Sequence, residues 1–308
     1  MSLSLPEVNI IFAGCGSFFA GTDQYQTNLV IEAKYPSGTV KRLLFDCGTD
    51  AKFSLPEVGL KPGDIDAVYV THQHGDHSGG LEWLAFGTYF GGKEKPKLIC
   101  EENLMEDLWE HGLKGAMTTI PGKTATLSEY FKCCAVPQEG GFYWANIYFA
   151  LHQTVHVCSG MSIKHCYGVL MSPAISERNT VLVKRNAGFD DIVIYDSGER
   201  ANVKLWDDKD LPCARYGDSS APRVLITGDT RFDPNIFGPA YNAAGLIVHD
   251  CETAPYKSGV HPSYDDLKTL PQYIKTKMLL CHYQPTDKDP TKDGFMGFAK
   301  KGQKVRIW

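Results

Sequence analysis

The chain has 308 residues, a formal net charge of −5 at pH 7, and 43% hydrophobic and 22% charged residues. This composition is ordinary for a globular protein, and it excludes a disordered chain, a collagen and a small disulfide scaffold. The acidic balance provides no global positive field for a nucleic-acid polymer, so a long nucleic acid is a disfavoured partner.

The cysteines and the N-terminus together predict a cytoplasmic protein. The ten cysteines are scattered without a C-x-x-C pair, which favours a reducing compartment over a disulfide-stabilised secreted fold. No Lys or Arg occurs before Lys34, so the basic region of a signal peptide is missing. The apolar stretch 8–20 contains glycines and is too short to span a bilayer, so we expect neither a membrane anchor nor a membrane partner.

Short apolar segments separated by turn residues make up the first half of the chain. They predict strands over 8–13, 27–33, 41–45 and 65–70. The last of these is almost wholly apolar, as in a strand covered on both faces, and runs directly into a histidine-rich segment. Helices are expected to start near Leu81 and to cover 101–113, where Leu104 and Leu108 have helical spacing.

The second half repeats the pattern of an apolar strand followed by a polar loop. Strands are expected over 223–226, 246–248 and 278–280. A helix should follow Ser263, a good N-cap residue, and Pro271 should end or kink it. Strands that alternate with helices predict an α/β fold in layers, with polar side chains brought to one rim by the strand ends.

Residues 171–222 form a polar insertion with strand-like runs at 180–184 and 191–195. The insertion holds seven Lys and Arg against nine Asp and Glu, so it is slightly acidic. One interpretation is a solvated surface excursion. The functional interpretations are a lid, a dimer contact or a substrate arm, because long inserted segments are often functional.

The segment His72-Gln73-His74-Gly75-Asp76-His77 is the strongest signal of chemistry in the chain. In an extended segment His72 and His74 project to the same side, so their imidazoles can share one metal. Gly75 permits a sharp turn, which directs Asp76 and His77 to a second point nearby. A cluster of idle surface histidines is the alternative, but a strand as apolar as 65–70 rarely ends in four ionisable groups. The segment therefore predicts two metals.

This segment has the form H-x-H-x-D-H, and with it the sequence resembles the metallo-β-lactamase superfamily. The resemblance covers most of the chain from Val8 to Trp308, with 171–222 outside it. It implies a single domain over 1–308 with an αββα sandwich and two metals at one edge of the sheets. It also implies ligands for the first metal (His72, His74 and a third histidine), ligands for the second (Asp76, His77 and a late histidine) and one bridging aspartate.

Two later segments supply the bridging and late ligands that the resemblance implies. Asp229 in Thr-Gly-Asp-Thr follows an apolar strand, and its two carboxylate oxygens could each bind one cation. His282 also follows an apolar strand. Without the resemblance, the Thr-Gly-Asp-Thr segment would be interpreted as a plain turn and His282 as a structural histidine.

The third histidine is His152 or His156, which lie too close in sequence for spacing to decide. We choose His156 because the strand after it, 167–170, is similar to the aromatic-glycine strand after the third ligand in the ribonuclease Z branch. His165 is the remaining competitor and is expected to lie behind the ligands or at the surface.

The reaction class follows from the metals and from His261. A pair of divalent cations holds a bridging water, lowers its pKa towards neutrality and stabilises developing negative charge. Gly-Val-His-Pro-Ser at 259–263 resembles the G-H-S segment of ribonuclease Z-like phosphodiesterases, in which that histidine serves the leaving group. His261 is therefore our general acid. A helix-terminal histidine without a role is the alternative, and Pro262 departs from the family pattern.

Three aspartates complete the expected machinery. Asp76 is counted with the catalytic residues as well as with the ligands. Asp250 occupies the place of the acidic residue in the H-E-A-T-like segment of the branch and would orient His261 or a ligand histidine. Asp46 matches the family's early aspartate, which braces the metal loops. His249, the residue before Asp250, is expected to be simply buried.

The insertion argues for a small substrate. Ribonuclease Z holds tRNA with a basic arm at this place in the chain, and the slightly acidic insertion suits that task poorly. The Asp-Cys-Glu and His-Tyr segments are similar to those of the phage-encoded anti-Pycsar type of cyclic-nucleotide phosphodiesterase. We therefore expect a metal-dependent phosphodiesterase that hydrolyses a small phosphodiester, first of all a cyclic nucleotide, with zinc as the metal and manganese as the alternative. The rival interpretations are an RNA 3′-end endonuclease, a lactone or thioester hydrolase, and a non-catalytic binding module, and a homodimer is left open.

Overall fold

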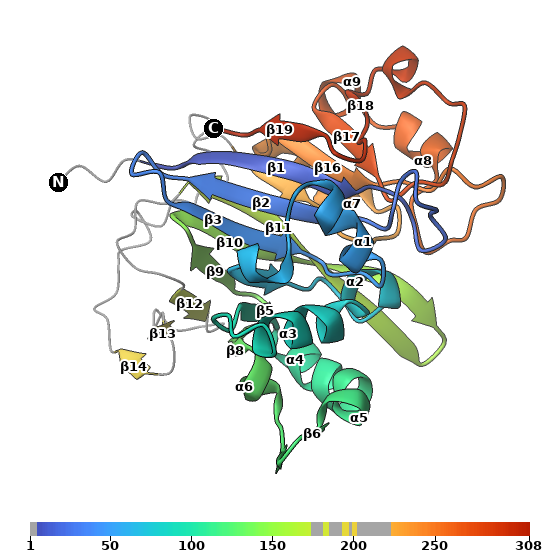
Figure 1. Cartoon of the computed structure of the whole chain (residues 1–308). Coiled ribbons are helices and arrows are strands. Elements are labelled where there is room, and N and C mark those ends of the chain that lie inside the picture. The colour runs from blue at the N-terminus through green and yellow to red at the C-terminus, as the bar shows by residue number, and fades with distance from the viewer. Residues whose placement is uncertain (1–4, 174–180, 185–192, 197–198, 202–222) are drawn as a thin grey trace. The chain divides into compact units, whose positions relative to one another are not determined.

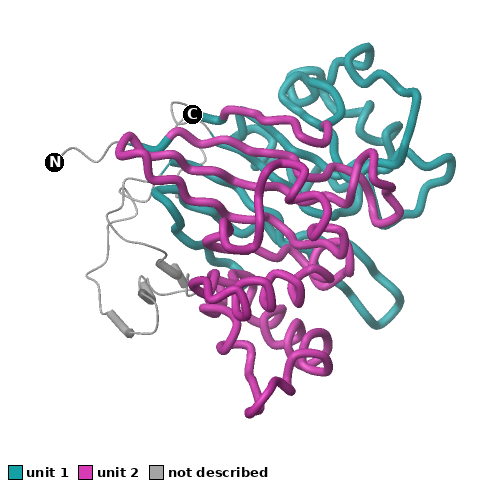
Figure 2. The backbone as a smooth tube through the Cα atoms, viewed as in Figure 1, with its two compact units in different colours: residues 1–6, 137–299, 307–308 teal, residues 7–136, 300–306 magenta. Residues whose placement is uncertain are grey.

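The computed structural model describes residues 5–173, 181–184, 193–196, 199–201 and 223–308, and it divides into two compact units (Figure 2). Unit 1 comprises Met1–Pro6, Pro137–Ala299 and Ile307–Trp308, and unit 2 comprises Glu7–Val136 and Lys300–Arg306. Each unit is built on one large β-sheet (Figure 1). That the units act as one domain remains a prediction from the sequence.

The sheet of unit 2 has seven strands in the order β19-β1-β2-β3-β4-β5-β8. The first four pair antiparallel, and β3, β4, β5 and β8 run parallel. Parallel pairing brings the carboxyl ends of β3 and β4 to the same edge, where the polar loops begin. The strands are β1 (Glu7–Gly14), β2 (Asn28–Lys34), β3 (Val40–Phe45), β4 (Ala67–Tyr69), β5 (Lys97–Glu101), β8 (Lys132–Val136) and β19 (Lys304–Arg306), with a separate β6 (Thr119–Ile120) and β7 (Lys123–Thr124) pair.

Short helices cover a face of this sheet and enclose its hydrophobic core. Leu44 and Val68 from the strands pack in one cluster with Leu55, Leu84 and Leu108 from the helices. The helices are α1 (Ala51–Glu57), the 3-10 turn η1 (Pro62–Asp64), α2 (Gly75–Ser78), α3 (Leu81–Tyr89), α4 (Glu102–Leu108), the π-helix η2 (Trp109–Leu113), α5 (Lys114–Met117) and α6 (Leu127–Tyr130).

The sheet of unit 1 has ten strands in the order β14-β13-β12-β9-β10-β11-β15-β16-β17-β18. A long antiparallel hairpin lies at its centre, and β15 to β18 run parallel beside it. The strands are β9 (Gly141–Trp144), β10 (Ile147–Ser159), β11 (Ser162–Pro173), β12 (Val181–Lys184), β13 (Val193–Asp196), β14 (Glu199–Ala201), β15 (Val224–Ile226), β16 (Leu246–Asp250), β17 (Met278–Cys281) and β18 (Gly297–Phe298).

Three helices pack on the parallel part of this sheet. Phe237, Leu267 and Ile274, one from each helix, share a core cluster with Ile247 and Leu280 of the strands. The helices are α7 (Pro234–Ala243), α8 (Tyr264–Lys268) and α9 (Gln272–Lys275), and η3 (Pro290–Asp293) is a 3-10 turn.

The structure confirms the α/β class and most expected elements, with differences at their ends. The strand expected over 65–70 is only β4, because the Ile65 N–H bonds back to the Pro62 carbonyl in the preceding turn. The helix expected over 101–113 begins one residue later, since the Glu101 side chain accepts the Asn103 and Leu104 N–H groups as a cap, and it continues as the π-helix η2. Of the insertion 171–222, its two strand-like runs are β12 and β13, and most of the rest lies outside the described residues.

Candidate metal centre

The histidine-rich segment of unit 2 forms the loop from β4 into the short helix α2. His72 and Asp76 are buried, and His74 is the N-cap residue of α2. The expected sharp turn is made by entry into this helix: Gly75 does not adopt the left-handed conformation, so its special freedom is not needed there. His74 therefore ends the extended segment, and Asp76 and His77 belong to the first turn of α2.

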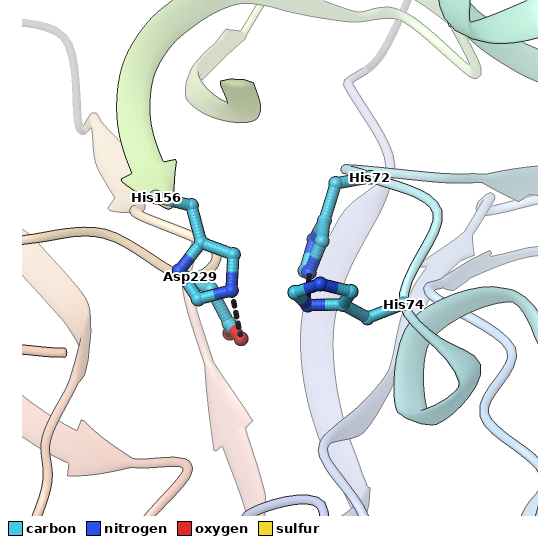
Figure 3. A group of neighbouring side chains, drawn as sticks. All are labelled: His72, His74, His156 and Asp229. Carbon is cyan, nitrogen blue, oxygen red and sulfur yellow. Dashed lines mark hydrogen bonds and ion pairs between the residues drawn. The ribbon is translucent and has the colours of Figure 1, made fainter. Parts of the chain in front are cut away.

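A chain of hydrogen bonds fixes the proton on His72. The Thr71 hydroxyl lies 3.0 Å from Asp46 Oδ2 and 3.0 Å from His72 Nδ1. A hydroxyl has one proton, so donation to the carboxylate requires that His72 Nδ1–H donates to Thr71. His72 Nε2 then carries a lone pair, and it lies 3.0 Å from His74 Nδ1 (Figure 3). Two imidazole nitrogens this close to each other could both bind one cation.

Asp46 holds His77 in the same manner. Asp46 Oδ2 accepts from His77 Nδ1 at 2.7 Å, which leaves the Nε2 lone pair of His77 3.3 Å from Asp76 Oδ2. Asp46 also accepts the Thr71 N–H at 2.8 Å. Burial raises the pKa of the Asp46 carboxyl although His77 and Thr71 favour its charged form. Asp46 adopts φ +62°, a left-handed conformation that non-glycine residues rarely hold without compensating contacts.

The turn after β3 is joined to the histidine-rich loop by backbone hydrogen bonds. Cys47 N–H donates to the His77 carbonyl at 2.7 Å, and Thr49 N–H donates to the Gly75 carbonyl at 3.1 Å. A Cβ at Gly48 would lie 2.3 Å from the Asp76 carbonyl oxygen, so only glycine permits this approach. The positions of Asp76 and His77 are therefore fixed by backbone contacts as well as by Asp46.

Unit 1 gathers a second group of ligand-type side chains at the ends of its parallel strands. Asp229, Asp250, His261 and His282 each offer a ligand atom, and these atoms lie within 4.8 Å of one another. Asp229 follows β15, Asp250 ends β16 and His282 follows β17. His282 adopts φ +61°, which turns the chain immediately after the strand. Its Nε2 lies 3.5 Å from Asp229 Oδ2.

Asp250 holds two histidines at once. Its Oδ2 accepts from His261 Nδ1 at 2.8 Å and from the Thr230 N–H at 3.0 Å, and its Oδ1 lies 3.4 Å from His282 Nδ1. Burial alone would raise the pKa of Asp250, but His261 and His282 outweigh it and lower the pKa. Burial would likewise lower the pKa of His261, but Asp250 and then Asp229 raise it. The protonated form of His261 is favoured in this arrangement.

His156 occupies a β-bulge in the β10–β11 hairpin. Val155 pairs with His165 and Val157 with Lys164, so His156 is the extra residue of the bulge. Bulges re-aim side chains, and here the His156 Nε2 lies 3.6 Å from Asp229 Oδ2 (Figure 3). Its Nδ1 is 3.1 Å from the Val260 carbonyl, which requires a proton on Nδ1. Burial lowers the pKa of His156 and favours the neutral ring that a metal needs.

The competing candidates His152 and His165, and His249, which was expected to be buried, also lie in unit 1. The His152 ring packs at 4.8 Å from the Phe237 ring of α7, and His165 lies beside Tyr167 at 6.5 Å between ring centroids. His249 is buried and bonded on both sides, through Nε2 to the Tyr241 hydroxyl at 2.7 Å and through Nδ1 to the Asp250 carbonyl at 2.6 Å. None of these three belongs to a ligand-type group in the described part of the chain.

The sequence pointed to the ligand-type side chains but not to the groups behind them. The Thr71 hydroxyl accepts the ring proton of His72, and the Val260 carbonyl accepts that of His156. Nothing in the sequence singles out either of these two acceptors. The bulge at His156 has no residue signature. In contrast, Asp46 followed the apolar strand β3 directly, and that position was a usable signal.

No helix in the described residues is both long enough and apolar enough to cross a membrane.

The chain is similar to known proteins over most of its length. The model of the family described as anti-Pycsar protein Apyc1 matches residues 8–205 and 199–305. The chain is 28% identical over 268 residues to the Apyc1 protein of Paenibacillus harenae, and this alignment covers 86% of the chain and 88% of the relative. It is 26% identical over 315 residues to the Apyc1 protein of Bacillus phage vB_BveM-Goe7, over 98% and 99% of the two chains.

Solved structures show the same fold at low sequence identity. The metallo-β-lactamase fold protein YhfI from Bacillus subtilis aligns with a TM-score of 0.63 and 17% identity over 98% of this chain and 99% of its own. A diphosphatase of the PhnP family aligns with a TM-score of 0.59 and 14% identity, and the alignment covers 97% of each chain. The short form of human tRNase Z aligns with a TM-score of 0.56 and 14% identity over 97% of this chain and 99% of its own. The chain belongs to the anti-Pycsar Apyc1 family, and it is a hydrolase with the metallo-β-lactamase fold.

Proposed function

We propose that this protein is a phosphodiesterase that hydrolyses a cyclic nucleotide with the help of two divalent metal ions. Membership of the Apyc1 family supports the activity, and the side chains of both units support the metals. The ligands of the proposed pair are His72, His74, Asp76, His77, His156, Asp229 and His282.

The observation that carries the proposal is the common state of four histidines. His72, His77 and His156 each have Nδ1 bonded to an oxygen, and His282 has Nδ1 near the Asp250 carboxylate. The Nδ1 bonds of His72, His77 and His156 leave an Nε2 lone pair on each of these rings, and the nearby carboxylate favours the same tautomer of His282. Metal-binding histidines in proteins have this arrangement, because the bond at one nitrogen fixes the tautomer and orients the ring. The buried His249, which is not a proposed ligand, also has Nδ1 bonded to an oxygen, but its Nε2 is bonded to the Tyr241 hydroxyl.

The donor set fits zinc best. Imidazole nitrogens and a few carboxylates are the ligands that zinc prefers, and manganese accepts the same set. A pair of such cations, when bound, lowers the pKa of water towards neutrality and offsets the charge of a phosphodiester. Asp229, buried and close to both His156 and His282, is the residue we assign to bridging.

His261 is the proposed general acid. Asp250 accepts the Nδ1–H of His261 and raises the pKa of the ring, so the protonated ring carries a second proton on Nε2, and this is the proton to be donated. An alkoxide that leaves phosphorus is strongly basic, and a protonated imidazole delivers the proton it needs. Asp250 stabilises the imidazolium before the proton is transferred and orients the ring throughout, in the way a carboxylate orients a catalytic histidine. Asp76 serves the reaction as a ligand.

A ribonuclease Z-like activity is the second candidate, because the short form of human tRNase Z shares the fold. The slightly acidic insertion 171–222 and the net charge of −5 favour the small substrate. We further propose a cytoplasmic location, in keeping with the nine cysteines of the described residues, which are all free thiols, and we leave a homodimer as a prediction from the sequence.

One substrate panel tests the proposal. Zinc-loaded and manganese-loaded protein would be given cyclic AMP, cyclic CMP, bis(4-nitrophenyl) phosphate, a precursor tRNA and a lactone. The proposal predicts turnover of at least one cyclic nucleotide well above that of the tRNA and the lactone. Turnover of the tRNA or the lactone with none of the cyclic nucleotides would contradict it.

A further inference from the structure

The loop between β1 and β2 of unit 2 exposes two neighbouring aromatic rings. Phe18 is 49% exposed and Phe19 is 85% exposed, and their rings meet edge to face with centroids 5.0 Å apart. Two phenylalanines in water leave a large apolar area uncovered, and exposed apolar patches commonly mark binding sites. The reaction machinery described above uses neither ring.

Hydrogen bonds hold this loop in one conformation. The Ala20 N–H donates to the Ser17 carbonyl at 2.9 Å, and the Gly16 N–H donates to the Tyr25 carbonyl at 2.8 Å. The Gln26 side chain donates to the Phe18 carbonyl at 3.2 Å. A Cβ at Gly16 would lie 2.9 Å from the Tyr25 carbonyl oxygen, so the two ends of the loop are in close contact. The aromatic rings are therefore presented by a fixed backbone.

The same loop is tied to the histidine-rich segment. The amide oxygen of Gln26 accepts from the Thr49 hydroxyl at 2.9 Å, and the Thr49 N–H donates to the Gly75 carbonyl. The Phe18 ring itself comes within 3.7 Å of the point where a Cβ on Gly75 would stand. Gly75 lies between His74 and Asp76. Phe18 thus borders the peptide that joins two of the proposed ligands.

We infer that Phe18 and Phe19 form a stacking platform for the nucleobase of the substrate. The inference rests on the proposed function, because it takes a nucleotide as the substrate. Every base has a π-face, so an aromatic platform adds affinity without choosing among bases, and edge-to-face or offset stacking suits two rings set at 71°. The phosphate of the substrate would bind at the proposed metal ligands, and its base would stack on the exposed rings of Phe18 and Phe19.

Steady-state kinetics of four variants test the platform. Phe19→Ala should raise KM for cyclic AMP about five- to thirtyfold with little change in kcat, because the ring contributes to binding only. Phe19→Trp should keep KM near that of the wild type, and Phe18→Ala should raise it less because that ring is half covered. Phe90→Ala is the matched control, since Phe90 is an exposed phenylalanine of the same unit at the end of α3.

Two ligands, one with a base and one without, distinguish binding of the base from binding of the phosphate. Calorimetry on zinc-loaded protein with AMP and with ribose 5-phosphate should show that Phe19→Ala weakens only the binding of AMP. An unchanged KM and unchanged AMP binding, or equal weakening of both ligands, would overturn the platform. If the wild type hydrolyses no cyclic nucleotide, the proposed function fails, but the comparison of AMP with ribose 5-phosphate still decides the role of the two rings.

Discussion

At the scale of single residues, the sequence revealed the candidate site residues because they lie close after apolar strands. Asp46 and His282 come immediately after β3 and β17, and His72 and Asp229 come three positions after the ends of β4 and β15. What the sequence could not supply was the hydrogen bond behind each ring. Whether a histidine presents Nδ1 or Nε2 depends on contacts between residues far apart in the chain, such as His156 and Val260.

The bridging role of Asp229 leads to the first prediction. Asp229→Asn keeps the size of the side chain and removes its charge, so the protein should lose at least one metal ion and nearly all turnover. Metal analysis and turnover of a cyclic nucleotide are the measurements. Asp265→Asn, at an exposed aspartate of the same unit, is the control and should retain both.

The general-acid role of His261 leads to the second prediction. His261→Gln should keep the metals, yet turnover of a cyclic nucleotide should fall about a hundredfold or more, the usual contribution of a general acid. Turnover of bis(4-nitrophenyl) phosphate should fall much less, because 4-nitrophenolate leaves without a proton. Full turnover of a cyclic nucleotide by this variant would show that the acid lies elsewhere.

Thr71 leads to a third prediction. Thr71→Val keeps the shape of the side chain but removes the hydroxyl that joins Asp46 to His72. Metal affinity should fall about ten- to hundredfold, as for other groups that orient a metal ligand. A competition titration with a chromogenic chelator would measure it, and Thr71→Ser should restore most of the affinity. Equal affinity in the valine and serine variants would contradict the proton assignment on His72.

At the scale of elements, the strand positions followed from apolar runs and the helix caps from residue types. Ser263 caps α8 through its hydroxyl, and Pro271 separates α8 from α9, as the sequence predicted. The β-bulge at His156 could not be foreseen, because it reflects how β10 pairs with β11 and leaves no composition signal. The same holds for the π-helix η2, which continues α4 without a break in sequence pattern.

β16 contains a histidine whose burial predicts a pH effect on stability. Burial lowers the pKa of His249, so the folded protein keeps the ring neutral while the unfolded chain protonates it below about pH 6.5. The contribution of His249 is therefore present above that pH and is lost as the pH falls, by up to about 1.4 kcal/mol per unit. Urea unfolding of metal-free protein between neutral and mildly acid pH should show a shallower loss of stability in His249→Gln than in the wild type. Equal slopes would contradict this assignment.

At the scale of the whole molecule, the resemblance in the histidine motif predicted the fold that the comparisons confirm. That the insertion 171–222 lies outside the compact pattern remains a prediction from the sequence, and its described strands β12 and β13 pair into the sheet of unit 1. The division into two units could not be predicted, because the motif residues follow strands in both sheets. Our central proposal is that the seven ligands named under the proposed function bind one pair of cations.

Metal content per chain, measured by mass spectrometry on purified wild type and two variants, tests that claim most directly. We predict about two ions in the wild type, and the loss of at least one ion both in His72→Ala of unit 2 and in Asp229→Asn of unit 1, with the remaining ion bound more weakly in each. Well under two ions in the wild type, or one variant that keeps the full wild-type content and affinity, would contradict it.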